Sequence, residues 1–266
     1  TSNLPVTQFY RVEVDDSSPA YFIYGGTQDN NSLGGPSRTF NAHGIANHDW
    51  FVTWGGDGFH ARIDPKDPNI VYSESQGGNI GRVNMATGER TGLAKPNWRA
   101  TWMMWEDSII VARGDTLVPE TAAMKKRIAD FRARQKADSA GLDLRWNWNT
   151  PFIISPHAAT TLYMGANRVM KSTKRGDEMF PISPELSYAD TMKIRVSTRT
   201  TGGITPDNTG AETYGTIVSI AESPLRPGLL YAGTDDGRVW STRNDGGAWE
   251  EHTKQFPGLP ANAYVS

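Results

Sequence analysis

The sequence predicts an all-β protein: a β-propeller of about four blades, or a partial ring of such blades, with one α-helical insertion. Two repeated phrases predict this fold. The phrase Tyr-x-Gly-Thr-x-Asp occurs at Tyr24 (YGGTQD) and again at Tyr231 (YAGTDD). A second phrase places Asp-Pro or Ser-Pro shortly before an apolar stretch that ends in tyrosine, as in RIDPKDPNIVY, IISPHAATTLY and IAESPLRPGLLY. Repetition of this kind is typical of repeat folds, in which a propeller blade takes roughly 40 to 50 residues.

Each repeat can be understood physically as one blade. Proline after Asp or Ser fixes φ for a turn and ends the first strand. Two apolar residues and a tyrosine (Tyr72, Tyr163 or Tyr231) then begin a second strand, which we expect to be buried between neighbouring blades. Gly, Asn or Asp follows, and these residues favour a tight hairpin into the third strand.

The repeats divide the chain into about four blades, which we expect near residues 6–54, 55–100, 146–200 and 211–258. The last letters, ANAYVS, look like the first strand of another blade. We therefore expect residues 1–266 to be a single propeller domain or a propeller fragment. Unpaired blade edges would favour association with other chains.

The hairpin of the last blade carries a local motif. We expect strands at 229–234 and 238–243 around the turn 235–237, followed by TRNDGGAW, which fits the Asp-box pattern Ser/Thr-x-Asp/Asn-x-Gly-x-x-Trp. The letters STKRGDEMF of the third blade match this pattern only in part. In such a hairpin the polar side chain caps turn amides and the tryptophan packs into the blade, so we expect a structural role. The residues that fill the pattern are Thr242, Asn244, Gly246 and Trp249.

These stretches together resemble a known family. The letters QFYRVEVDDSSPAYFIYGGTQDNNSLGGPSRT, the segment from DWFVTWGGDGF to NMATGE, RWNWNTPFIISPH and GTDDGRVWSTRNDGGAWE are similar to bacterial BNR/Asp-box β-propellers of the sortilin-like (VPS10-type) group. The same repeat architecture is related to that of xyloglucanases and sialidases. The resemblance implies the propeller fold, whereas propellers host many activities, so it specifies function only weakly.

Residues 95–142 interrupt the β pattern. A helix is predicted near 119–138, with Pro119 in its first turn, Gly141 at its C-cap, and Met124, Ile128 and Phe131 on one face. Two interpretations remain open: a surface helix packed on the propeller, and a docking element for a partner protein or acidic surface. Just upstream, 98–111 is rich in Trp and Met, and we expect an extra strand pair under the helix or part of an interface.

The insertion supplies the candidate partner contacts, which are aromatic residues upstream and basic residues with one aromatic on the helix. They are Trp102, Trp105, Lys125, Lys126, Arg127, Phe131, Arg132 and Arg134. The net charge of −2 gives no support for a nucleic-acid partner.

Catalytic chemistry has little support in the sequence. A glycosidase needs two carboxyl groups facing each other across a bond, and the turn residues Asp29, Asp57, Asp235 and Asp236 are the candidates. Each of them is also explained as a turn cap. We therefore expect no catalytic residue, and if the chain is an enzyme it would be a glycoside hydrolase.

Metal and cofactor sites have no clear signature either. The five histidines show no ligand spacing and cysteine is absent, which excludes disulfides and thiolate ligands. Loops 29–32 and 64–69 could hold Ca²⁺, but they need no ion to form turns. We expect no cofactor and no metal. No apolar run approaches the roughly 18 residues of a membrane span.

The expected function is non-catalytic: a protein-binding or scaffolding propeller, an accessory subunit of a larger extracytoplasmic or envelope-associated, membrane-peripheral assembly. The alternative is a carbohydrate-active propeller, either a glycoside hydrolase or a glycan binder. A cleft with aromatic walls and two facing carboxylates would favour the hydrolase.

Overall fold

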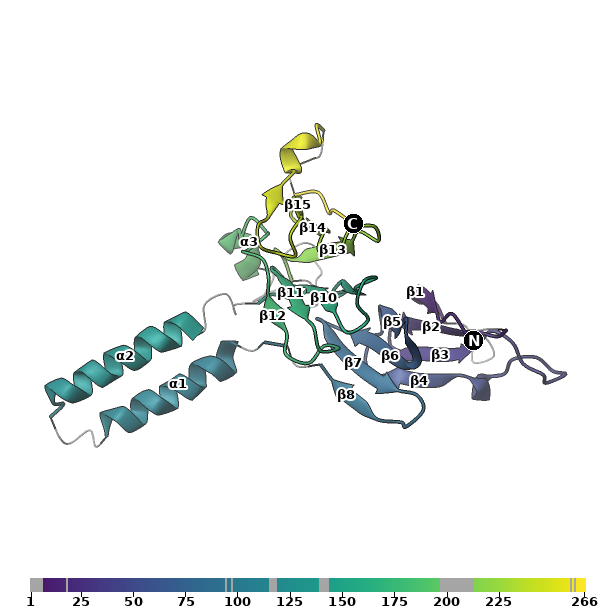
Figure 1. Cartoon of the computed structure of the whole chain (residues 1–266), viewed down its shortest axis with the longest axis horizontal. Helices are drawn as coiled ribbons and strands as arrows, with labels where there is room; N and C mark the ends of the chain where they lie inside the picture. The colour runs from purple at the N-terminus through teal and green to yellow at the C-terminus, as the bar shows by residue number, and fades with distance from the viewer. Residues whose placement is uncertain are drawn as a thin grey trace. The chain divides into compact units, whose positions relative to one another are not determined.

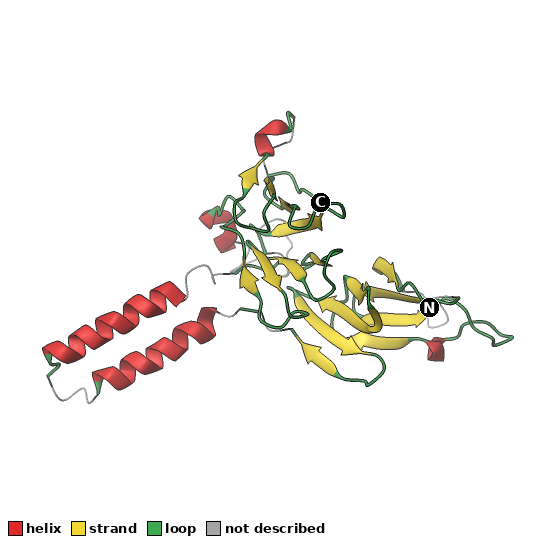
Figure 2. Cartoon of the chain, viewed as in Figure 1, coloured by secondary structure: helices red, strands yellow, loops and turns green. Residues whose placement is uncertain are grey.

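The computed structural model describes residues 7–17, 19–93, 95–96, 98–114, 119–138, 144–196, 213–258, 260 and 262–266. The chain forms two units (Figures 1 and 2). The first comprises 1–94 and 145–266 and contains every strand among the described residues, and the second is the insertion 95–144.

The first unit consists of four antiparallel sheets of four strands each, arranged as in a propeller, which confirms the predicted fold class. Sheet 1 contains β1 (Phe9–Val14), β2 (Phe22–Thr27), β3 (Ser32–Pro36) and β4 (Phe51–Trp54). Sheet 2 contains β5 (Ala61–Asp64), β6 (Asp67–Ser75), β7 (Asn79–Asn84) and β8 (Arg90–Gly92). Sheet 3 contains β9 (Phe152–Ile154), β10 (Leu162–Gly165), β11 (Val169–Ser172) and β12 (Phe180–Pro181). Sheet 4 contains β13 (Ile217–Glu222), β14 (Leu230–Thr234), β15 (Val239–Thr242) and β16 (Glu250–Glu251).

Each sheet is a simple meander, in which every strand pairs with the next one along the chain. The described segments between the strands include the short helices η1 (Asn47–Asp49), α3 (Thr191–Val196) and η3 (Thr253–Gln255).

The second strand of each sheet explains why the tyrosine phrase recurs. Neighbouring residues on a strand point to opposite faces, so the tyrosine and the residue before it face different sheets. Tyr24 of sheet 1 packs against Ala61 and Val71 of sheet 2. Tyr163 of sheet 3 packs against Leu230 of sheet 4. The tyrosine therefore packs against the following sheet, as in sheets 1 and 3, and the apolar residue before it packs against the preceding sheet, as Val71 and Leu230 do.

Glycines in the second strands let the next sheet come close. A Cβ on Gly26 would lie 2.0 Å from the backbone carbon of Gly58, and one on Gly165 would lie 2.7 Å from Cγ2 of Ile217. Both contacts are with residues at the start of the following sheet. The phrase Tyr-x-Gly is therefore a packing requirement, because a side chain at this position would push the sheets apart.

A backbone hydrogen bond accompanies each of these contacts. The Thr27 carbonyl accepts from Gly58 N at 2.9 Å, and the Ala166 carbonyl accepts from Ile217 N at 2.7 Å. At the equivalent place in sheet 4, the Thr234 carbonyl accepts from Val265 N at 3.2 Å. Val265 thus occupies the position at which the first strand of a following sheet begins. The segment 262–266 itself forms no strand.

The second unit is a helical hairpin of α1 (Trp98–Arg113) and α2 (Ala122–Asp138). The extra strand pair predicted at 98–111 is wrong, because this segment is helical. Ile109 and Ala112 of α1 are buried with Ile128 of α2, and Phe131 packs against them. Apolar residues three and four positions apart form one helical face, and α2 provides the surface that buries it.

The start of α2 also differs from the prediction. Pro119 lies before the helix, and Thr121 is the capping residue, since its Oγ1 accepts from Met124 N at 3.2 Å. The threonine hydroxyl accepts a hydrogen bond from a backbone amide of the first helical turn. Proline has no side-chain acceptor and would leave that amide without a partner. The predicted C-cap, Gly141, lies outside the described residues. Among the described residues, no helix is long and apolar enough to cross a membrane.

Candidate functional site

One edge of the first unit is formed by the turns that follow the second strands and by the segments that lead into the next sheets. We call it the loop edge, and it comprises 28–31, 55–58, 76–78, 145–150, 166–168, 213–216 and 235–237. Hydrogen bonds connect these pieces across the sheets. Asp57 N donates to Gln76 Oε1 at 3.1 Å, Gly77 N donates to the Trp148 carbonyl at 3.0 Å, and Asn147 Nδ2 donates to Thr216 Oγ1 at 3.0 Å. The loop edge is therefore one continuous surface.

The four candidate carboxylates all lie on this edge. Asp57 Oδ1 accepts from the backbone N of Asp29 at 2.8 Å, so the structure brings these two together. Asp29 itself has a φ of +62°, a left-handed turn conformation that Asp tolerates. The Asp57 carboxylate therefore stabilises the turn that contains Asp29 and connects it to the segment that leads into sheet 2.

Asp235 and Asp236 lie in the turn after β14 and are buried. We expected them to cap their own turn, but the backbone amides that bond to them belong to other segments. Asp235 accepts from Gly215 N at 3.0 Å and from both N and Oγ1 of Thr216. Asp236 accepts from Tyr188 N at 2.7 Å and from Thr234 Oγ1 at 2.5 Å. Burial raises the pKa of Asp235 to about 6, although the bonds from Thr216 oppose that rise. Both carboxylates are therefore engaged in hydrogen bonds within the protein.

A pocket opens at the sheet 1 end of the loop edge. Its cavity of about 340 Å³ is lined by Thr7, Gln8, Phe9, Tyr10, Gln28 and Asn30. The Tyr10 hydroxyl donates to Gln28 Oε1, and Asn30 Nδ2 donates to the Gln28 carbonyl at 3.2 Å. The pocket therefore combines two aromatic rings with amide side chains, whose groups both donate and accept hydrogen bonds.

The floor beside this pocket is aromatic. The rings of Tyr10 and Phe59 lie 4.9 Å apart between centroids, and Phe59 meets Trp148 edge-on at 6.4 Å. Tyr10 is 46% exposed, whereas Phe59 is buried. Phe59 thus fixes the Tyr10 ring while leaving much of it open to solvent. We did not predict this pocket from the sequence. No local pattern indicates it, because only the pairing of β1 with β2 brings Tyr10 beside Gln28.

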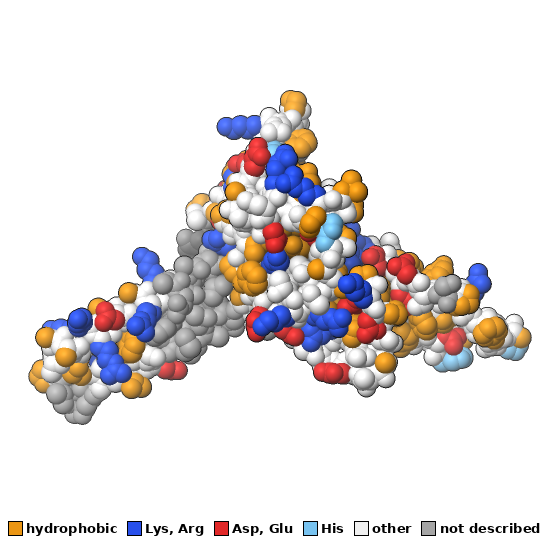
Figure 3. Space-filling model, viewed as in Figure 1, with side chains coloured by type: hydrophobic (Ala, Val, Ile, Leu, Met, Phe, Trp, Pro, Cys, Tyr) orange, Lys and Arg blue, Asp and Glu red, His pale blue; other side chains and the backbone are white. Residues whose placement is uncertain are grey.

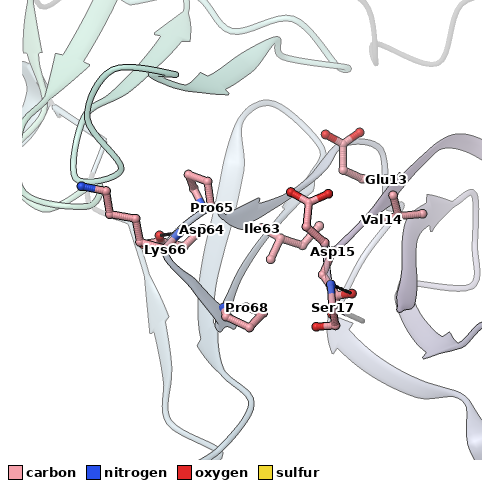
Figure 4. Close-up of a pocket in the computed structure, with 10 residues that line it drawn as sticks. Glu13, Val14, Asp15, Ser17, Ile63, Asp64, Pro65, Lys66 and Pro68 are labelled. Atoms are coloured by element: carbon pink, nitrogen blue, oxygen red, sulfur yellow. Dashed lines mark hydrogen bonds between the residues drawn. The ribbon is translucent and has the colours of Figure 1, made fainter. Parts of the chain in front are cut away.

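A second cavity of about 390 Å³ lies at the opposite end of sheets 1 and 2 (Figure 4). Figure 4 shows Glu13 and Asp15 on one side and Asp64 with Lys66 on the other. Asp15 Oδ1 accepts from Phe22 N at 2.9 Å, and Asp64 forms an ion pair with Arg175 at 3.1 Å. Its acidic groups therefore stabilise turns and a neighbouring sheet.

The residues that fit the Asp-box pattern begin with Thr242, the last residue of β15, and continue into the hairpin that follows. Thr242 Oγ1 accepts from Gly246 N at 3.1 Å, and Asn244 Oδ1 accepts from Ala248 N at 2.9 Å. Trp249 Nε1 donates to the Ile182 carbonyl of sheet 3 at 2.8 Å. These contacts hold a hairpin and attach it to the preceding sheet.

The candidate partner contacts lie on the hairpin of α1 and α2. The side chains of Lys125, Lys126, Arg127, Arg132 and Arg134 are exposed, and Figure 3 shows Lys and Arg side chains spread over this face of the hairpin. Phe131 instead packs in the seam between the helices, with the Arg127 guanidinium 5.4 Å from its ring centroid. The side chains of Trp102 and Trp105 lie outside the described residues.

No metal centre emerges within the described ranges, where no group of three or more His, Asp or Glu side chains could hold an ion. Comparison with known proteins gives no family assignment. The chain matches no family model and no curated protein. A BNR or sortilin-like family is therefore not established by these searches.

Solved structures resemble the chain in fold. The GH74 enzyme of Niastella koreensis has a TM-score of 0.48 and 13% identity, over 91% of this chain and 29% of that chain. A GH74 xyloglucanase from Xanthomonas campestris gives 0.41 and 13%, over 85% of this chain and 26% of that chain. The extracellular domain of a hybrid two component system from B. thetaiotaomicron gives 0.43 and 12%, over 94% and 24%. The chain thus spans less than a third of the length of each of these proteins.

Proposed function

We propose that the chain is a non-catalytic, carbohydrate-binding β-propeller that holds a glycan in the pocket at Tyr10. The single observation that carries this proposal is the composition of that pocket. An aromatic ring, fixed from below by Phe59 and open above, stands beside the amide groups of Gln8, Gln28 and Asn30.

Sugars have two chemically different surfaces, and the pocket offers a partner for each. The exposed face of Tyr10 is a rigid apolar surface with a polar tip, which suits the C–H face of a pyranose. The amides supply donors and acceptors for its hydroxyl groups. Few polar groups converging on a largely preformed concave site are typical of small-molecule binding sites.

The proposal is for binding without cleavage. Hydrolysis of a glycoside needs an acid and a base or nucleophile at a fixed separation. Beside the pocket, the Asp57 carboxylate accepts a hydrogen bond from the backbone amide of Asp29. Asp235 and Asp236 are buried and hydrogen-bonded at the far end of the loop edge. We also propose that the hairpin at 242–249 is an Asp-box and that the protein has an extracytoplasmic location.

Affinity electrophoresis through gels that contain single soluble polysaccharides, neutral and acidic, tests the proposal. At least one polysaccharide should retard the protein, and Tyr10→Ala should weaken that retardation at least tenfold. Tyr21→Ala is the matched control, because Tyr21 is 43% exposed but lies at the other end of β2. Retardation by no polysaccharide, or equal retardation of both variants, would contradict binding at Tyr10. Release of reducing sugar would contradict the non-catalytic part.

A further inference from the structure

Two adjoining cavities lie between sheets 1 and 2, at the end of these sheets opposite the pocket at Tyr10. They adjoin because Asp15, Ser17 and Pro68 line both of them. The larger is the cavity of about 390 Å³ in Figure 4, and the smaller has a volume of about 290 Å³. Cavities that hold small molecules in proteins have volumes of about 300 to 1,000 Å³. The space between the two sheets is therefore large enough for a small ligand.

Asp15 is a buried carboxylate at the junction of the two cavities. It is only 5% exposed. Its Oδ1 accepts hydrogen bonds from Ser17 N at 3.2 Å and from Phe22 N at 2.9 Å, whereas its Oδ2 accepts none from the residues that the structure describes. Within the same residues Asp15 forms no ion pair. Because a buried carboxylate is normally paired with a cation, its charge is left for a ligand to compensate.

The larger cavity is negatively charged. Its described lining includes four carboxylates and one ammonium, on Glu13, Asp15, Asp16, Asp64 and Lys66. Glu13 and Asp64 each pair with an arginine, at 3.5 Å and 3.1 Å. Figure 4 shows the Lys66 side chain extending away from Asp15. The cavity therefore favours a cation beside Asp15.

The smaller cavity has aromatic walls. The ring centroids of Phe22, Tyr24 and Phe51 lie between 6.1 and 6.4 Å from one another. Met85, which follows the third strand of sheet 2, also lines this cavity. Aromatic faces attract organic cations, and methionine adapts to irregular apolar shapes. This part of the site therefore suits an apolar group that is attached to a positive charge.

The Tyr24 hydroxyl is a second buried polar group that lines this space. Tyr24 is 3% exposed, and its hydroxyl forms no hydrogen bond within the part of the chain that the structure describes. Burial, and then the charge of Asp15, raise the pKa of Tyr24 to about 12, so the phenol is neutral at physiological pH. A buried polar group without a partner is costly. A ligand with N–H donors would satisfy the phenol oxygen.

We propose that these cavities bind an organic amine, whose ammonium pairs with Asp15 and whose apolar group lies among Phe22, Tyr24 and Phe51. A metal ion fits the site less well. Among the described residues no group of three or more His, Asp or Glu side chains could hold one, and the aromatic walls supply no oxygen ligands of the kind that Ca²⁺ and Mg²⁺ prefer. The amine site is separate from the pocket at Tyr10 and does not depend on glycan binding.

Ligand-observed NMR titration with phenethylammonium tests the proposal. The wild type should bind this amine at least tenfold more tightly than the neutral phenethyl alcohol or the anionic hydrocinnamate, which have similar shapes. Asp15→Asn should weaken amine binding at least tenfold, because it removes the charge but keeps an oxygen for the amides of Ser17 and Phe22. Asp29→Asn is the matched control and should bind as the wild type, because it removes a carboxylate from the loop edge at a φ that Asn tolerates.

Two further arms complete the experiment. Tyr24→Phe replaces Asp15→Asn if circular dichroism shows that the latter is unfolded, and it should weaken amine binding at least threefold. A peptide that begins with phenylalanine and has a free N-terminus distinguishes the sources of the amine: tighter binding of the peptide supports a protein terminus, and tighter binding of phenethylammonium supports a free amine. Failure of both amines to bind at millimolar concentration, equal binding of the alcohol, unchanged affinity of Asp15→Asn, or displacement of the amine by Ca²⁺ would overturn the proposal.

Discussion

At the scale of single residues, Tyr163 and Tyr72 occupy equivalent positions but differ in the hydrogen bonding of their hydroxyl groups. Tyr163 Oη donates to Asp245 Oδ1 of the next sheet at 2.8 Å, and Lys171 also pairs with Asp245. Burial, and then this bond, raise the pKa of Tyr163. The equivalent Tyr72 is fully buried, and its hydroxyl has no hydrogen-bond partner among the described residues. Burial raises the pKa of Tyr72 to about 12.

Removal of each hydroxyl should therefore have a different result. Tyr163→Phe should lower the free energy of unfolding by about 1 to 2 kcal/mol, because it breaks a bond to a carboxylate. Tyr72→Phe should be neutral or slightly stabilising, because it removes a buried polar group that forms no bond. Urea unfolding followed by tryptophan fluorescence measures both, and each variant serves as the control for the other. Equal losses would contradict the difference in bonding.

His60 gives a prediction about pH. It is buried, and burial, together with Arg62 and Arg11, lowers its pKa from 6.5 to about 3. Below pH 6.5 the unfolded chain therefore binds a proton that the folded chain does not. His60 thus contributes a loss of stability as the pH falls from about 6.5 towards 3, at up to about 1.4 kcal/mol per pH unit.

The measurement compares the wild type with His60→Gln across that pH range. The raised pKa of Asp235, about 6, has the opposite effect between pH 3.8 and 6, where the folded chain binds more protons. The difference between wild type and variant isolates His60, because Asp235 is common to both. Parallel stability curves would show that His60 is not the group responsible.

The residues of the candidate site were predictable only in part. We expected Asp29, Asp57, Asp235 and Asp236 to cap their own turns, because Asp beside Gly or Asn favours that role. The last three do accept backbone hydrogen bonds, but from segments distant in the sequence, which a local pattern does not reveal. The pocket at Tyr10 could not be predicted. It joins Thr7 to Tyr10 with the turn at Gln28, and only strand pairing brings these two stretches together.

At the scale of elements, the insertion shows where sequence patterns become ambiguous. The charged stretch of α2 has one narrow apolar line, so its helix was predictable. Segment 98–111 is rich in large apolar residues, which suit a buried strand as well as a buried helix face. Ile109 and Ala112 of this segment pack against Ile128 of α2. That contact is with a distant part of the chain, so the local sequence pattern does not reveal it.

That this hairpin docks a partner protein remains a prediction. Lys125 and Lys126 are exposed, as are the apolar residues Ile110 and Val111 on α1, whereas Phe131 contributes to the seam. The double change Lys125→Gln and Lys126→Gln should lower the recovery of a crosslinked partner from source cells at least threefold. Lys66→Gln with Lys254→Gln is the control, since both lysines are exposed outside the hairpin. Unchanged recovery would count against docking through these lysines.

At the scale of the whole molecule, the repeat explains why the number of sheets was predictable. Each blade is specified by local letters, namely the Asp/Ser-Pro turn, the apolar pair and the tyrosine, and sheets in such folds contact mainly their neighbours. The exposure of the individual tyrosines was not predictable, because the sequence around Tyr231 has the same pattern as that around Tyr24. Only the order of the sheets determines that Tyr24 is buried and Tyr231 is exposed.

The points at which the insertion leaves and rejoins the sheets have a consequence for engineering. On one side, a Cβ on Gly176 would lie only 2.4 Å from Leu93, so Leu93 is tightly held by sheet 3. On the other side, Arg145 binds Glu185 at 2.9 Å and the Gly215 carbonyl at 3.0 Å. The free-energy cost of closing a loop grows slowly with its length. Between two ends fixed in this way, a designer could exchange the hairpin for an unrelated cargo domain and leave the scaffold intact.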